Sequence, residues 1–145
     1  MNDAEYEKEK ARVEAICDKW HDLLGMGYWE ISYIWERDSY DADGGNTPPS
    51  RWARTTHAET ATAWEYRRAS IAFYLRNTVG ESDAEIEKTV LHEFAHVLVN
   101  EMRDDTPRSR KHEERVVSGL SDVFRWIWEA ASPSGVDASG DVLNG

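Results

Sequence analysis

Apolar side chains recur at helical spacing near the start of the chain. In residues 3–24 they fall on one narrow arc of a helical wheel, which predicts an amphipathic helix. The members of this arc are Tyr6, Val13, Ile16, Cys17, Trp20 and Leu24. Gly25 and Gly27 follow and are typical of a helix end. In the next segment Trp29, Ile31, Tyr33 and Trp35 alternate with polar or smaller residues, which predicts a strand.

The middle of the chain combines turn residues with short runs that favour strands. Residues 36–52 are rich in Asp, Gly and Pro and show no periodicity, so we expect a loop. Between Ala53 and Leu75 the content of Thr, Ala and aromatic residues predicts two strands. One covers residues 60–66 and the other residues 69–75, with a tight turn near Arg67 and Arg68.

Two further helices are predicted in the last third of the chain. Ser82 opens a capping-box sequence, Ser-Asp-Ala-Glu, and the helix it begins is expected to reach about Met102. Pro107 suits the first position of a last helix that ends near Ala131. The order of elements predicts an α+β fold with a small, mostly antiparallel sheet of about three strands. We expect one domain over residues 1–131 and a disordered tail over residues 132–145, which are small and polar.

Size and charge narrow the classes of partner. The chain has 145 residues, which is enough for one domain with a hydrophobic core. Its 28 acidic and 17 basic residues give a formal net charge of -11. Because such a charge repels phosphate backbones and anionic lipids, neither a nucleic acid nor a membrane is expected as a partner. No apolar run approaches the length of a membrane span.

The single cysteine and the N-terminal residues indicate a compartment. Cys17 lies on the apolar arc of the first predicted helix, which favours a core thiol in a reducing environment. The first five residues are acidic and lack the apolar stretch of a secretory signal. A cytoplasmic location is therefore expected.

One motif carries candidate chemistry, His92-Glu93-Phe94-Ala95-His96. On a helix, its two histidines project from one face about a turn apart, close enough to bind the same metal ion. Glu93 points toward the same side and can accept a proton from a metal-activated water. Neutral imidazoles suit Zn²⁺, so His92 and His96 are predicted zinc ligands and Glu93 the general base.

The rest of this helix supports that interpretation. Its apolar residues form a broad arc, made of Ile86, Val90, Leu91, Phe94, Ala95, Val97 and Leu98. His92 and His96 lie outside the arc and Glu93 at its margin, whereas a pair of core histidines would lie inside it.

A third ligand is needed, and the last helix offers two carboxylates. The metzincin extension is absent, because Val99 and Met102 stand where it requires Gly and His. The apolar residues of the last helix place Glu113 near the middle of their arc and Glu114 near its edge. A carboxylate in the middle of an apolar arc must be paired or bound to metal, so periodicity alone favours Glu113.

The sequence that starts at Glu114, Glu-Arg-Val-Val-Ser-Gly-Leu-Ser, resembles the pattern that follows the ligand glutamate of gluzincin peptidases. Val117 is larger than the small residue usual in that pattern. The separation between His96 and Glu114 is also similar to that in thermolysin-like and aminopeptidase members. The resemblance implies Glu114 as the third ligand, with Glu113 as the alternative; the other carboxylate would orient a ligand histidine.

From Trp29 through the last helix, the layout resembles small bacteriophage-encoded metallopeptidases and, more distantly, the compact gluzincin domains of phage-repressor and stress-response proteases. Residues that carry this likeness are Trp64-Glu65-Tyr66, residues 69–75, the zinc-motif helix and Glu113-Glu114. The resemblance implies a minimal zincin-like domain in the host-cell cytoplasm. It also implies hydrolysis of a protein or peptide substrate by zinc-activated water, with Glu93 as the general base.

Two other functions fit the same residues. The domain can be a non-catalytic zinc module with a structural or protein-interaction role. Alternatively it is similar to SprT-like proteases, with His112 as the third ligand, although Glu113 stands where those proteins have Gly. His57, Tyr66 and Tyr74 are candidate oxyanion-stabilising groups, for which a surface histidine and core aromatic rings are the simpler interpretation.

Overall fold

The structure is a computed structural model that describes residues 1–37, 57–100 and 106–132. Helix α1, Asp3–Leu23, begins at a reciprocal cap, in which the Asn2 side chain accepts the Glu5 N–H and the Glu5 carboxylate accepts the Asn2 N–H. Gly25 adopts a φ of 65° just after its last turn, a conformation that glycine accepts without strain. The predicted first helix is thus confirmed, with its end one residue earlier than expected.

Three strands form one mixed sheet in the order β1-β3-β2. Strand β1 is Glu30–Glu36, β2 is Ala58–Ala63 and β3 is Arg68–Tyr74. The antiparallel pairing of β2 with β3 agrees with the predicted sheet, but β1 runs parallel to β3. The expectation of a mostly antiparallel sheet is corrected here. Trp35 of β1 stacks on Phe73 of the central strand, and no short hairpin ties β1 to β2.

The strand predicted over residues 60–66 is shorter at its end than expected. Trp64–Tyr66 form a 3₁₀ turn, and both aromatic side chains are exposed, so Tyr66 is not part of the core. Arg67 has a φ of 52°, and its N–H donates to the Trp64 carbonyl. The chain needs these residues to reverse direction between β2 and β3. Leu75, predicted as a strand residue, instead begins the short helix α3, Leu75–Thr78.

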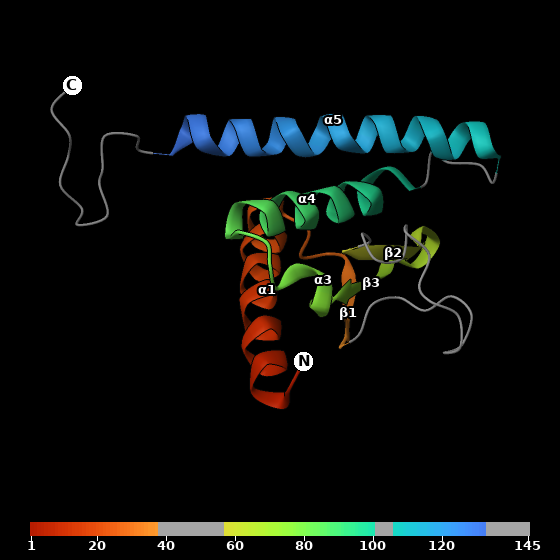
Figure 1. Ribbon diagram of the computed structural model, residues 1–145. Helices are drawn as coiled ribbons and strands as arrows, with labels where there is room; N and C mark the ends of the chain where they lie inside the picture. The colour runs from red at the N-terminus through yellow and green to blue at the C-terminus, as the bar shows by residue number, and fades with distance from the viewer. Residues whose placement is uncertain (38–56, 101–105, 133–145) are drawn as a thin grey trace, which may run out of the picture.

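The last two helices lie side by side, α5 above α4, and α5 extends beyond both ends of α4 (Figure 1). Helix α4, Asp83–Val99, starts at the predicted capping box of Ser82 and Glu85. Helix α5, Pro107–Ala131, begins at Pro107, as predicted, and its N-cap is Thr106, whose hydroxyl accepts the Ser109 N–H. The α+β fold class is confirmed.

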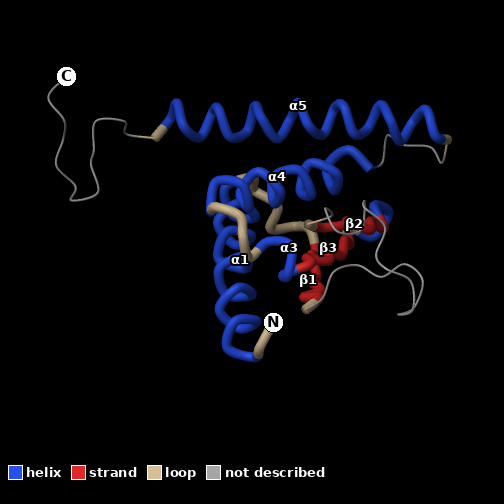
Figure 2. The backbone as a smooth tube through the Cα atoms, viewed as in Figure 1, coloured by secondary structure: helices blue, strands red, loops and turns tan. Residues whose placement is uncertain are grey.

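The core lies where α1, α4 and the sheet meet (Figure 2). Helix α1 contributes Val13, Cys17 and Trp20, and the central strand contributes Ile71 and Phe73. Helix α4 buries most of its predicted arc there, including Ile86, Val90, Leu91, Phe94 and Val97, but Leu98 of that arc is exposed. Because α4 is anchored along this face, its opposite face is held in a fixed position beneath α5 and beside β2.

Some sequence predictions fall outside the described residues. These are most of the loop predicted over residues 36–52, the helix end near Met102 and the tail beyond Ser132. Within the part of the chain that the structure describes, no helix combines the length and the apolarity that crossing a bilayer requires.

Candidate metal centre

The two histidines of the zinc motif and one carboxylate of α5 converge on one point. His92 and His96 project from α4 toward α5, with 3.2 Å between their Nε2 atoms. The Glu114 carboxylate lies 3.3 Å from His92 Nε2 and 3.0 Å from His96 Nε2. One ligand atom from each of the three residues lies within 4.8 Å of the other two.

These separations suit a zinc ion. Two ligands at about 2.0–2.1 Å from a tetrahedral zinc ion lie about 3.3 Å from each other. The two Nε2 atoms lie 3.2 Å apart, close to that value, and the imidazoles approach different oxygens of Glu114, His92 at 3.3 Å from Oε2 and His96 at 3.0 Å from Oε1. Two neutral imidazoles with one carboxylate are also a donor set of the kind found at catalytic zinc sites. The residues present therefore fit the ion that the motif implies.

The other nitrogen of His96 is held by the second carboxylate of α5. Glu113 Oε1 lies 2.8 Å from His96 Nδ1, and Glu113 is only 7% exposed. A carboxylate in this place fixes the ring orientation and the tautomer that leaves Nε2 free to bind metal. The structure thus places Glu114 at the candidate metal position and Glu113 behind His96. His112, by contrast, is exposed and does not join the cluster of His92, His96 and Glu114.

Burial sets the protonation state of His92. Removal from water lowers its pKa below the ordinary value, and the neighbouring His96 adds to the shift, whereas Glu114 opposes it. The neutral imidazole is the form that binds a metal ion. His92 is therefore disposed toward metal binding at neutral pH.

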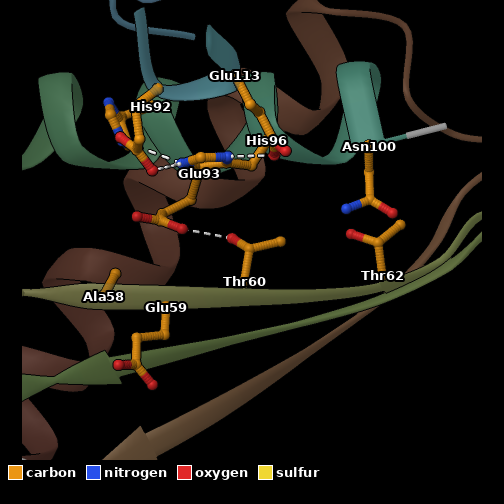
Figure 3. Close-up of a pocket in the computed structure, with 10 residues that line it drawn as sticks. Ala58, Glu59, Thr60, Thr62, His92, Glu93, His96, Asn100 and Glu113 are labelled. Atoms are coloured by element: carbon orange, nitrogen blue, oxygen red, sulfur yellow. Dashed lines mark hydrogen bonds and ion pairs between the residues drawn. The ribbon is translucent and has the colours of Figure 1, made fainter. Parts of the chain in front are cut away.

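Glu93 lines the same cleft as His92 and His96, and its carboxylate points toward Thr60 of strand β2 (Figure 3). It is 6% exposed, and burial raises its pKa above the ordinary value. The Thr60 hydroxyl donates a hydrogen bond to Glu93 Oε2, which stabilises the ionised form and opposes that shift. A carboxylate whose pKa is moved toward neutrality can both accept and return a proton.

The cluster opens into a cleft of about 350 Å³ between α4, α5 and β2. Ala58, Thr60 and Thr62 of β2 face α4 across it, and Asn100 lies beyond the end of α4 (Figure 3). Thr60, Thr62 and Asn100 were not among the predicted site residues. The two threonines could have been recognised as neighbours on one face of the sheet, because alternate residues of a strand face the same side.

The other candidate side chains lie apart from the cluster. Tyr74 is buried, and its hydroxyl donates a hydrogen bond of 3.0 Å to Glu59, so this contact joins β3 to β2. His57 Nε2 lies 3.2 Å from Glu81, in a neighbouring hollow that also contains His92 and Glu93.

Comparison of the chain with protein families, with curated proteins and with solved structures found no match. The case for a function therefore depends on the geometry of this cleft.

Proposed function

We propose that the protein is a zinc-dependent peptidase that hydrolyses peptide bonds in the cleft between α4, α5 and β2. The observation that carries the proposal is the cluster of His92, His96 and Glu114, in which one ligand atom from each residue lies within 4.8 Å of the other two. These three residues would hold the ion. When bound, zinc supplies a Lewis acid that polarises a carbonyl group and makes a water molecule more acidic.

The remaining steps belong to side chains of the chain itself. Glu93 accepts a proton from the attacking water and returns it to the leaving amine, and Thr60 holds the carboxylate of Glu93 in place. Glu113 holds His96 in one orientation. Burial of Glu93 beneath the cleft keeps bulk water from competing for its proton.

Strand β2 supplies a position for the substrate. It is the edge strand of the sheet, and it borders the cleft next to the candidate metal ligands. An extended peptide that adds antiparallel to this edge uses backbone hydrogen bonds alone, so its sequence is not restricted by that contact. Such a peptide passes alongside the candidate metal ligands, next to the contact between Thr60 and Glu93.

A donor set of three protein ligands favours catalysis over a structural role. Among the described residues, the cluster contains His92, His96 and Glu114 and no fourth histidine, cysteine or carboxylate. Structural zinc sites have four protein ligands, whereas catalytic sites keep one position for water or substrate. This observation supports a peptidase rather than a structural zinc module.

Replacement of Glu93 by Gln tests the proposal. The variant should bind one zinc ion per chain, as the native protein does, and its cleavage of a peptide library should fall by about 10²–10⁴-fold. Metal content is measured by mass spectrometry and cleavage by peptide sequencing. Glu14→Gln makes the same chemical change at an exposed position of α1 and should retain full turnover. Undiminished cleavage by Glu93→Gln, or native protein without stoichiometric zinc, would refute the proposal.

A further inference from the structure

A second hollow adjoins the candidate metal centre at the beginning of β2. It has a volume of about 260 Å³ and shares Ala58, His92 and Glu93 with the neighbouring cleft. The residues that it adds are His57, Lys88 and Thr89. Whatever occupies this hollow therefore lies directly beside the residues proposed to perform the chemistry.

Lys88 places a permanent positive charge at this hollow. It stands four residues before His92 on α4, so the two side chains project from the same helix face, with Cβ atoms about 5–6 Å apart. Lys88 is exposed and makes no ion pair with any described residue. His57 differs in this respect, because its ring faces Glu81.

The charges of the two hollows contrast. Three acidic residues with side chains on the α4 side of β2 line the larger cleft, Glu93, Glu113 and Glu114, whereas the Glu59 carboxylate points to the other side of β2 (Figure 3). Among the described residues that line either hollow, Lys88 is the only lysine or arginine. A negatively charged group of a bound peptide is therefore repelled along most of the cleft and attracted at the Lys88 end.

The directions of β2 and α4 fix which part of a peptide reaches Lys88. Both elements cross the cleft in the same sense: Ala58 lies below His92, and Thr62 lies near Asn100 (Figure 3). A peptide antiparallel to β2 enters with its N-terminal part near Thr62 and leaves with its C-terminal part near Ala58. Residues that follow the cleaved bond therefore point toward Lys88.

We propose that Lys88 selects peptides that carry a carboxylate immediately after the cleaved bond. The carboxylate belongs either to an Asp or Glu side chain or to the C-terminus of the peptide itself. Thr89, in the same hollow, offers a hydroxyl that can donate a second hydrogen bond. This specificity rests on the proposed peptidase function, but binding of the carboxylate does not require turnover.

The experiment compares matched peptides that differ only at the residue after the cleaved bond. One set places Glu, Gln or Lys there in a peptide with an amidated C-terminus, and a second set ends at that residue with a free acid or an amide. The native protein should process the Glu peptide about fivefold more efficiently than the Gln peptide, in kcat/KM, because one partly exposed charge pair has that effect. A preference in the first set assigns the side chain as the carboxylate source, and a preference for the free acid in the second assigns the C-terminus.

Charge variants then connect the preference to Lys88. Lys88→Gln should remove the discrimination between Glu and Gln, and Lys88→Glu should invert it in favour of the Lys peptide. Lys8→Gln changes the same charge at an exposed position of α1 and should leave the preference unchanged. The proposal is overturned if the native protein treats Glu and Gln peptides equally and also treats the free acid and the amide equally, or if a preference survives Lys88→Glu.

Binding measurements separate this proposal from the proposed function. Labelled peptides of both sets are titrated into zinc-loaded Glu93→Gln protein, and binding is followed by fluorescence anisotropy. About fivefold tighter binding of the Glu peptide, abolished by the additional Lys88→Gln change, supports the specificity even if the native protein cleaves nothing. If the native protein cleaves peptides but shows no preference for a carboxylate, the proposed peptidase function stands and the proposed role of Lys88 is rejected.

Discussion

The contact between Thr60 and Glu93 joins the sheet to the helix of the candidate metal centre. The hydroxyl donates to the ionised carboxylate, so it lowers the pKa of Glu93 relative to the value that burial alone would produce. Glu93 was predictable from its spacing within the motif. Thr60 was not, because its contact with Glu93 depends on how α4 packs against β2.

Replacement of Thr60 by Val tests this contact. The variant keeps the shape of the side chain but removes the hydrogen bond, so the pKa of Glu93 should rise. If Glu93 is the general base, the acidic limb of the pH profile of kcat/KM should move to higher pH. Thr62→Val removes the other cleft hydroxyl of β2, which does not contact Glu93, and should leave that limb in place. An unshifted limb in Thr60→Val would contradict the assignment of Glu93.

Cys17 shows a second effect of burial at the scale of one residue. Its thiol is fully buried in the core, and burial raises its pKa above the ordinary value. In the unfolded chain the thiol ionises near pH 8.5, whereas in the folded protein it stays protonated. The stabilisation from the buried thiol is therefore complete below about pH 8.5 and is lost as the pH rises above it.

This linkage can be measured by urea unfolding at pH 7.5 and pH 9.5. The free energy of unfolding of the native protein should fall by about 1.4 kcal/mol for each pH unit above 8.5 through Cys17 alone. Cys17→Ala should lack this component, so the difference between the two proteins should shrink at high pH. A thiol reagent should also fail to modify Cys17 until the protein is unfolded. Rapid labelling of the folded protein would show that the thiol is accessible.

At the scale of elements, the helices were more predictable than the sheet. The capping sequences of α4 and α5 and their apolar arcs are local signals, and both helices begin where those signals place them. The strand pairing is not local: the partner of β1 is set by aromatic contacts such as that between Trp35 and Phe73. Likewise Trp64 and Tyr66 favour strands by composition, yet they form the turn that β3 requires.

The capping box of α4 makes a direct stability prediction. Ser82 accepts the Glu85 N–H, and the Glu85 carboxylate accepts the Ser82 N–H. Ser82→Ala removes the hydrogen bond from the Glu85 N–H to the Ser82 hydroxyl and should lower the free energy of unfolding by about 1 kcal/mol. The helix end lies far from Glu93 in the sequence, so zinc content should not change. Chemical denaturation checks the first result and metal analysis the second. An unaltered midpoint would show that the cap is not needed for α4.

The choice between Glu113 and Glu114 also depends on packing between elements. Periodicity indicated that Glu113 is buried, and it is, but its contact is with the far nitrogen of His96. Glu114, at the edge of the arc and still 59% exposed in its side chain, reaches both imidazoles. A helical wheel shows which residues face a neighbour. It does not show how far α5 is displaced along α4, and that displacement decides which carboxylate meets which nitrogen.

At the scale of the whole molecule, zinc would add a link between two helices that already meet through side-chain packing and the contact of His96 with Glu113. His92 and His96 come from α4 and Glu114 from α5, so binding should favour the folded state over the unfolded chain. With free zinc at 100 times the dissociation constant, the stabilisation is about 2.7 kcal/mol. Thermal unfolding with zinc should therefore occur about 10 °C higher than with a chelator.

A matched variant tests this coupling. In Glu114→Gln the carboxylate is lost but the shape of the side chain is retained, and most of the zinc-dependent rise in melting temperature should disappear. Calorimetry in zinc and in chelator provides both values. If zinc stabilises Glu114→Gln as much as the native protein, α5 does not supply the third ligand.

The central position of β3 has a consequence for the order in which the sheet can assemble. Strand β2 reaches β3 through one short turn, whereas β1 pairs with β3 across a long intervening segment. Closing a long loop costs more chain entropy, so the β2–β3 hairpin should be established before β1 joins it. During ribosomal synthesis β1 nevertheless emerges first. Its aromatic side chains therefore lack their packing partners until β3 has left the ribosomal exit tunnel.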